Sequence, residues 1–205
     1  MKQLFLYLFG ILISSLGIAF FIKADVGVGT TDSVAVGLSS HIPISVGVGM
    51  MTVHVTVILL NSVLGKTIPS LFVFIPIVLR GVTLDLWNFL LTDFQLESLV
   101  LRWGLLFVGI AFMGIGIGSY LHTNLPKIPV DELMQTLMKK DGLSLRVNRN
   151  LYEFSLLVIG FLLGGPIGIG TFVISFLLGP SIQFFYERWN DLISPTKERQ
   201  YASTS

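Results

Sequence analysis

The stretch Ala24–Asp32, ADVGVGTTD, breaks two apolar runs apart and decides how the chain is organised. A similar break returns 99 residues later as Thr123–Asp131, TNLPKIPVD. With this offset the two halves of the chain stay in step. The aligned pairs are Gly17 and Gly116, Asp25 and Asn124, Asp32 and Asp131, Leu38 and Leu137, Ser45 and Ser144, and Gly65 and Gly164. A self-match at a fixed period predicts a duplicated structural unit.

The composition places the chain in a membrane. Of its 205 residues 53% are hydrophobic and only 12% are charged, whereas soluble domains carry about 25% charged residues. The chain has no cysteine, which excludes disulfides and cysteine-based metal or redox sites. Its net charge of +1 and scattered basic residues argue against nucleic-acid binding. The expected partners are the lipid bilayer and a small solute, and self-association into a homo-oligomer stays open.

Six segments are long and apolar enough to cross a bilayer, which takes about 20 residues. They are Leu4–Ile22, Val46–Leu64, Ile68–Leu91, Leu99–Leu121, Val147–Leu163 and Ile169–Tyr186. Two shorter segments, Ser33–Ile42 and Val130–Met138, follow the two breaks, and we expect them to be re-entrant half-helices. Residues 1–91 would then form the first repeat, 99–186 the second, and 187–205 a polar tail. The predicted fold class is an all-α polytopic membrane protein.

Charge placement predicts the orientation. With both termini in the cytoplasm, ten of the thirteen Lys and Arg residues lie on the inner side, as the positive-inside rule requires. Three crossings per repeat is an odd number, so the two repeats would be inverted relative to each other. An eight-span arrangement with parallel repeats has a similar charge bias, and the shortness of the two half-helices favours six spans. We expect the membrane to be the bacterial plasma membrane.

Four motifs resemble one family of proteins. They are KADVGVGTTDSVAVGLS at 23–39, DGLSLRVNRNLYE at 141–153, GFLLGGPIGIGT at 160–171 and LLGPSIQ at 177–183. Their order is similar to that in YczE/YyaS/YitT-type bacterial membrane proteins, from Gly10 to Phe185. The resemblance implies a fold and a membrane location, and it implies no reaction.

Arg149 and Glu153 are candidate site residues on the segment Val147–Leu163. They lie one helical turn apart on one stripe, which they share with Arg146. Glu153 falls inside the apolar segment, where Arg149 is its natural partner, and polar groups at such depth are functional candidates. The alternative is a structural ion pair that fixes the helix at the inner interface.

His54 holds the position in the first repeat that Glu153 holds in the second. Two polar side chains related by internal symmetry could converge near the midplane of the membrane. Proton coupling by His54 or Glu153 is the functional interpretation. The alternative for His54 is a simple hydrogen bond between helices.

Arg80 lies in the middle of the apolar segment Ile68–Leu91. Asp85 follows five residues later, about 140° around a helix, so we expect the two not to pair. Partners must come from elsewhere: Asp25, Asp32, Glu153 or a bound anion. A buried structural ion pair is the alternative.

Asp32 and Asp131 should lie in the first turns of the two half-helices, where the helix dipole favours a carboxylate. A purely structural role would therefore explain both. The functional interpretation is that free N–H groups of Gly27–Thr31 and of residues 128–130 line a solute site.

Other patterns argue against alternative chemistry. Gly164–Thr171, GGPIGIGT, has no preceding strand and no following Lys-Ser or Lys-Thr, so it reads as a tight loop between spans. Gly114 and Gly118 have the spacing of close helix packing. The histidines His41, His54 and His122 lack metal-ligand spacing, and no catalytic set stands out. We expect no enzyme, no cofactor and no metal site.

The sequence therefore favours a small secondary transporter or permease for a small solute, an anion or carboxylate among the candidates. Six residues would line the site: Asp32, His54, Arg80, Asp131, Arg149 and Glu153. Arg80 would bind the anion. The rival hypothesis is a membrane scaffold or regulatory partner that transports nothing.

Overall fold

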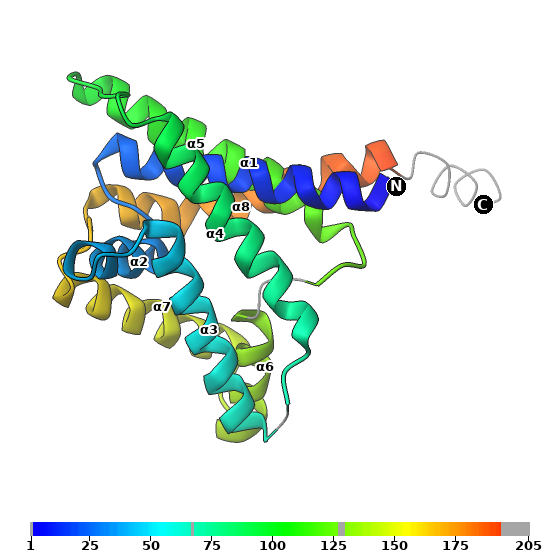
Figure 1. The fold of residues 1–205 in the computed structure, drawn as a ribbon. Helices are drawn as coiled ribbons and strands as arrows, with labels where there is room; N and C mark the ends of the chain where they lie inside the picture. The colour runs from blue at the N-terminus through cyan, green and yellow to red at the C-terminus, as the bar shows by residue number, and fades with distance from the viewer. Residues whose placement is uncertain (1, 67, 127–129, 194–205) are drawn as a thin grey trace.

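The structure, a computed structural model, describes residues 2–66, 68–126 and 130–193 (Figure 1). These residues form helices joined by loops and turns, with no strand among them. The helices are α1 (Lys2–Ala24), α2 (Thr30–His41), α3 (Val46–Gly65), α4 (Phe74–Leu90), α5 (Leu99–Leu121), α6 (Val130–Asp141), α7 (Leu145–Leu162) and α8 (Ile169–Ile193). A 3-10 turn, η1 (Leu71–Val73), leads directly into α4.

Within the described residues, five helical segments are long and apolar enough to cross a membrane, namely α1, α3, η1 with α4, α5 and α8. They correspond to five of the six predicted spans. The sixth, α7, has three charged residues within its 18 residues, and so it is less apolar than the others. Helices α2 and α6 have 12 residues each. Each is therefore about 18 Å long, short of the roughly 30 Å of a hydrocarbon core.

Some helix ends differ from the prediction. Helix α2 begins at Thr30, three residues before the predicted Ser33, and α6 runs on to Asp141. Helix α8 continues to Ile193, past its predicted end. Contacts one turn apart support that extension, with Arg188 stacked over the Phe184 ring at 5.4 Å.

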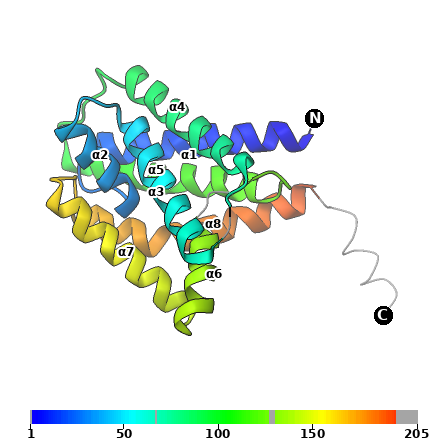
Figure 2. The same ribbon diagram turned by 60° about the horizontal axis from the view of Figure 1, so that its bottom comes forward.

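The helices gather in two groups. In the first group α1 and α5 contact each other, α4 packs against α1, and α8 packs against α5. In the second group α2, α3, α6 and α7 pack among themselves. Contacts between α3 and α4 join the groups. In Figure 2 the long helices α1, α5 and α8 run alongside one another, with α6 and α7 lying to one side. Each half of the chain contributes two helices to each group.

Helices α1 and α5 cross at reciprocal glycines. A Cβ atom on Gly10 would lie 2.6 Å from the Gly116 carbonyl oxygen, and one on Gly17 would lie 2.7 Å from that of Gly109. The early glycine of α1 therefore meets the late glycine of α5, so the two helices run antiparallel. Gly10 and Gly109 are 99 residues apart, as are Gly17 and Gly116. Each glycine thus packs on the counterpart of the other.

Small residues also bring α5 against α8, as the spacing of Gly114 and Gly118 predicted. A Cβ atom on Gly118 would lie 2.9 Å from the Tyr186 backbone nitrogen, and one on Gly114 would clash with the Ser181 hydroxyl. The close-packing role predicted for these two glycines is confirmed.

Polar contacts hold α4 to α1, which matters because lipid gives little hydrophobic drive between helices. The Thr83 hydroxyl donates to the Ser15 hydroxyl at 2.8 Å, and the Trp87 indole donates to the Leu12 carbonyl at 3.0 Å. These bonds fix the face that α4 turns toward the protein interior, and Arg80 lies on that face.

Candidate functional site

The N-terminus of α2 forms the centre of the site. Gly29 is the N-cap residue and has no side chain to cap the helix. The carboxylate of Asp32, three residues on, accepts a hydrogen bond from the Gly29 backbone N–H. This contact is one half of a capping box, and it explains why α2 begins earlier than predicted. Only 7% of the Asp32 surface is exposed.

The Gly-rich break before α2 packs against the loop between α7 and α8. The Val28 N–H donates to the Pro166 carbonyl at 3.1 Å, and the Gly170 N–H donates to the Val26 carbonyl at 2.8 Å. Gly27 has a φ of 125°. A Cβ atom there would lie 2.6 Å from the Thr171 backbone nitrogen, so only glycine fits. The loop between α7 and α8 is residues 163–168. The predicted Gly164–Thr171 loop is therefore a loop as far as Gly168, and from Ile169 on it is the first turn of α8. This segment also anchors the start of α2.

Helix α7 brings Glu153 to the start of α2. The Thr30 hydroxyl donates to the Glu153 carboxylate across 123 residues of sequence. Gly160, two turns further along α7, leaves room for the Ser33 side chain. Glu153 is half-buried and lies within electrostatic range of Asp32. Two carboxyl groups therefore meet at one helix N-terminus.

Arg80 supplies the positive charge of the site from α4. Only 8% of its surface is exposed, and its Nε has no hydrogen-bond partner among the described residues. One terminal nitrogen lies 3.6 Å from the Met113 sulfur, a weak acceptor. The charge of Arg80 acts on both Asp32 and His54. No described carboxylate lies within the 4.0 Å that defines an ion pair with Arg80.

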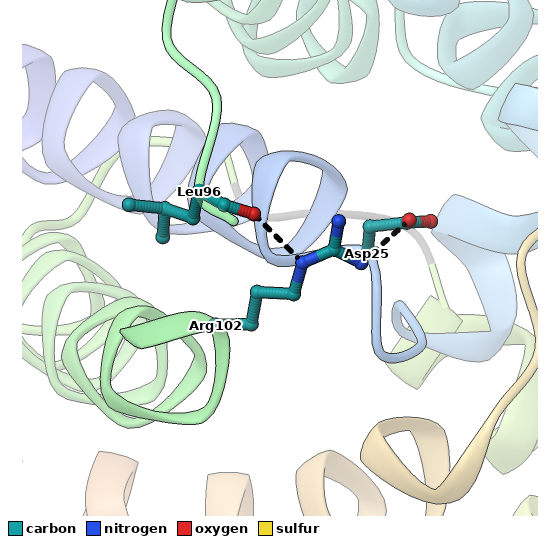
Figure 3. Close-up of polar contacts among 3 residues, drawn as sticks. All are labelled: Asp25, Leu96 and Arg102. Carbon is teal, nitrogen blue, oxygen red and sulfur yellow. Dashed lines mark hydrogen bonds and ion pairs between the residues drawn. The ribbon is translucent and has the colours of Figure 1, made fainter. Parts of the chain in front are cut away.

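Two other acidic residues that sequence reasoning considered near Arg80 have partners elsewhere. Asp25, a candidate partner of Arg80, pairs instead with Arg102 at 3.0 Å, which corrects that expectation. Arg102 also donates to the Leu96 carbonyl at 2.9 Å (Figure 3). Asp85 accepts from the Ser45 hydroxyl at 2.5 Å and from the Gly47 N–H at 2.8 Å, and so it caps α3. The expectation that Asp85 does not pair with Arg80 agrees with this geometry.

His54 completes the cluster from α3. It is 6% exposed, and its Nδ1–H donates to the Met50 carbonyl at 2.9 Å. This bond assigns the proton of the neutral ring to Nδ1, because the carbonyl can only accept. The other ring nitrogen is thereby left as an acceptor.

Burial and neighbouring charges shift the acid–base behaviour of Asp32. Burial raises the pKa of Asp32 to about 6. Arg80 and the Gly29 N–H oppose this shift of the pKa, whereas the Glu153 carboxylate reinforces it. A carboxyl group with such a pKa can change its protonation state near neutral pH.

The structure brings together Asp32, His54, Arg80 and Glu153, four of the six predicted site residues. Arg149 lies one turn from Glu153 on α7, with an exposed side chain. The Asp131 side chain lies outside the described part of the chain. Whether Arg149 and Glu153 pair stays a prediction.

Sequence reasoning missed two members of the cluster. It considered Thr30 only as a helix cap, and it did not single out Tyr152, whose hydroxyl interacts with Glu153. For Tyr152 a signal existed, since a polar-tipped aromatic residue stands next to Glu153. For the Thr30–Glu153 bond the sequence holds no signal, because it depends on how α2 and α7 pack.

A family model described as "Family of unknown function (DUF6198)" matches residues 1–187. The chain belongs to the DUF6198 family. The resemblance noted from the four motifs is confirmed by relatives in Bacillus subtilis (strain 168). The uncharacterized protein YyaS is 31% identical over 186 residues, which cover 90% of this chain and 92% of YyaS.

A second Bacillus subtilis (strain 168) relative, the uncharacterized membrane protein YczE, is 26% identical over 201 residues. The match covers 96% of this chain and 91% of YczE. An uncharacterized protein of Haemophilus influenzae (strain ATCC 51907 / DSM 11121 / KW20 / Rd) is 38% identical over 78 residues. No solved structure matches the chain. The apolar helices and YczE together support a membrane location for this DUF6198 protein.

Proposed function

We propose that this DUF6198 protein is a secondary transporter for a small anion or carboxylate in the bacterial plasma membrane, and that it is not an enzyme. The observation that carries the proposal is Arg80. A guanidinium in an apolar span is costly, and such groups persist where they pair or bind a solute. Arg80 is 8% exposed, with its Nε unpartnered in the described part of the chain. A bound anion would supply the hydrogen-bond acceptor that the Nε of Arg80 lacks among these residues.

The surroundings of Arg80 suit an anion. The N-terminus of α2 carries the positive end of a helix dipole, and helix N-termini bind anions in broken-helix transporters. Gly29, as the N-cap residue, has no side chain that could occupy the N–H groups of the first turn. Arg80 could also grip a carboxylate or nitrate with two parallel hydrogen bonds, which lysine cannot do.

The arrangement of helices supports inverted repeats with α2 and α6 as re-entrant half-helices. Helices α1 and α5 hold equivalent places in the two halves and run antiparallel. Parallel repeats would need both helices to cross in the same direction. The packing also has matched pairs, because α2 contacts α3 and α7, whereas α6 contacts α7 and α3. This symmetry is typical of transporters with a site at the repeat interface, and both termini would then be cytoplasmic.

The test is thermal stability of purified protein with and without sodium nitrate, acetate, lactate or phosphate. A ligand held only by the folded state stabilises it, by about 2.7 kcal/mol at a hundredfold excess over Kd. We expect at least one of these anions to raise the melting temperature of the wild type. Arg80→Lys should fold and lose most of this shift, since a point charge replaces the planar fork.

The matched control is Arg102→Lys, which alters a partly exposed arginine in an ion pair. Adding the anion should raise the melting temperature of Arg102→Lys by as much as that of the wild type. If none of the four anions stabilises the wild type and Arg80→Lys behaves like it throughout, the anion site is refuted. Uptake of the stabilising anion into proteoliposomes then separates a transporter from a membrane scaffold that merely binds it.

A further inference from the structure

We infer that anion binding at Arg80 is linked to uptake of one proton by the Asp32 carboxyl group, so that solute and proton occupy the site together. This inference rests on the proposed function and deepens it. Sequence reasoning assigned proton coupling to His54 or Glu153. The geometry of the cluster points to Asp32 instead.

The charges of the cluster call for a proton when an anion enters. The charge of Arg80 and the charge of Glu153 both act on Asp32, so the cluster contains one guanidinium and two carboxyl groups. If both carboxyl groups are ionised, the cluster already has one excess negative charge. A bound anion would add a second in a buried place, where like charges repel strongly. Protonation of one carboxyl group removes that excess.

Asp32 is the better proton acceptor of the two carboxyl groups. It is 7% exposed, whereas Glu153 is half-buried and accepts a hydrogen bond from the Thr30 hydroxyl. The Glu153 carboxylate therefore already has a hydrogen-bond donor from the protein. The Asp32 carboxylate is held ionised chiefly by Arg80 and by the Gly29 N–H. An anion on Arg80 would cancel the larger of these two influences.

The other groups around α2 fit this assignment. His54 on α3 already donates its Nδ1–H to Met50. Tyr152 and Glu153 face α2 from α7, and Arg149, one turn before Glu153 on the same stripe, has an exposed side chain. The pKa of Asp32, raised by burial to about 6, would rise further once an anion screens Arg80. Binding is reciprocal, so protonation of Asp32 must strengthen anion binding by the same factor.

The experiment measures the Kd of nitrate and of acetate for the purified protein between pH 5 and pH 8. Nitrate keeps its charge over this range, so any change in its Kd belongs to the protein. We expect the Kd to rise with pH, by up to about tenfold per pH unit once Asp32 is ionised. A pH indicator in weak buffer should report proton uptake when nitrate is added near neutral pH.

Three variants locate the proton. Asp32→Asn should bind nitrate with a Kd that no longer depends on pH. Glu153→Gln should keep the pH dependence with its midpoint moved to lower pH, because the Glu153 charge raises the proton affinity of Asp32. The control Asp25→Asn changes an exposed carboxylate with a φ of 51°, which Asn tolerates, and it should match the wild type.

The outcomes separate this inference from the proposed function. If nitrate and acetate bind the wild type and the Kd of each stays the same at every pH, the inference is wrong and the anion site stands. Loss of the pH dependence in Glu153→Gln would move the proton to Glu153 and overturn the assignment, even where Asp32→Asn fails to fold. If nitrate, acetate, lactate and phosphate all fail to bind at any pH, the inference is wrong together with the anion site.

Discussion

Two arginines show how much the surroundings of a residue decide its role. Arg102 is partly exposed and pairs with Asp25 at 3.0 Å, an interaction worth about 1 kcal/mol or less at a surface. Arg80 is buried, and its guanidinium donates to the Met113 sulfur, a weak acceptor. Because the two side chains are chemically identical, the difference lies in what neighbouring helices place beside them. Of the two, Arg80 is the arginine whose Nε lacks a hydrogen-bond partner in the described part of the chain, which is the feature that the proposed anion site requires.

A second residue-scale consequence concerns Asp85. Its carboxylate accepts from both the Ser45 hydroxyl and the Gly47 N–H at the start of α3. Asp85→Ala removes both bonds and should lower the stability by about 1–3 kcal/mol. Thermal unfolding of the purified variant measures this loss. Asp93→Ala, in an exposed turn, is the control and should stay close to the wild type; equal melting temperatures for the two variants would contradict the capping role.

At the scale of elements, the crossing of α1 and α5 depends on glycine. A Cβ atom on Gly116 would lie 2.5 Å from the Ser14 backbone nitrogen and 2.6 Å from the Gly10 carbonyl oxygen. Gly116→Ala should therefore push the helices apart and cost about 1–3 kcal/mol, the usual range for overpacking. Thermal unfolding checks this expectation.

Gly104 on the same helix is the matched control for Gly116. A Cβ atom there meets no described heavy atom within 4 Å. Gly104→Ala should leave the stability unchanged or raise it by about 0.5–1 kcal/mol, since alanine favours a helix. If both alanine variants behave alike, the tight α1–α5 crossing is wrong.

At the scale of the whole molecule, the ends of α2 and α6 distinguish the two topologies. His41 and Lys140 are exposed near the ends of these short helices and correspond under the 99-residue offset. Inverted repeats with re-entrant half-helices predict that a cysteine at position 41 is labelled from outside and one at 140 from inside. Eight spans with parallel repeats would place both inside. Membrane-impermeant thiol reagents can measure this directly, because the native chain has no cysteine.

The sequence by itself determined the class of the molecule and the identity of most of its elements. Composition and the length of apolar runs are local properties. They predicted six spans, and five of these correspond to the described helices that are long and apolar enough to cross a membrane. They also predicted the short helices after the two breaks and the close packing at Gly114 and Gly118. These features depend only on residues near one another in the chain.

Only the tertiary structure decided which polar groups meet. It joined Thr30 to Glu153, set Gly168 and Thr171 against Gly27, and paired Asp25 with Arg102 instead of Arg80. The physical reason is that hydrogen bonds and ion pairs require atoms within about 3–4 Å. A rotation of one residue turns a helix by about 100°, enough to remove a side chain from such a contact. The positions of α2, α4 and α7 relative to one another therefore create the site.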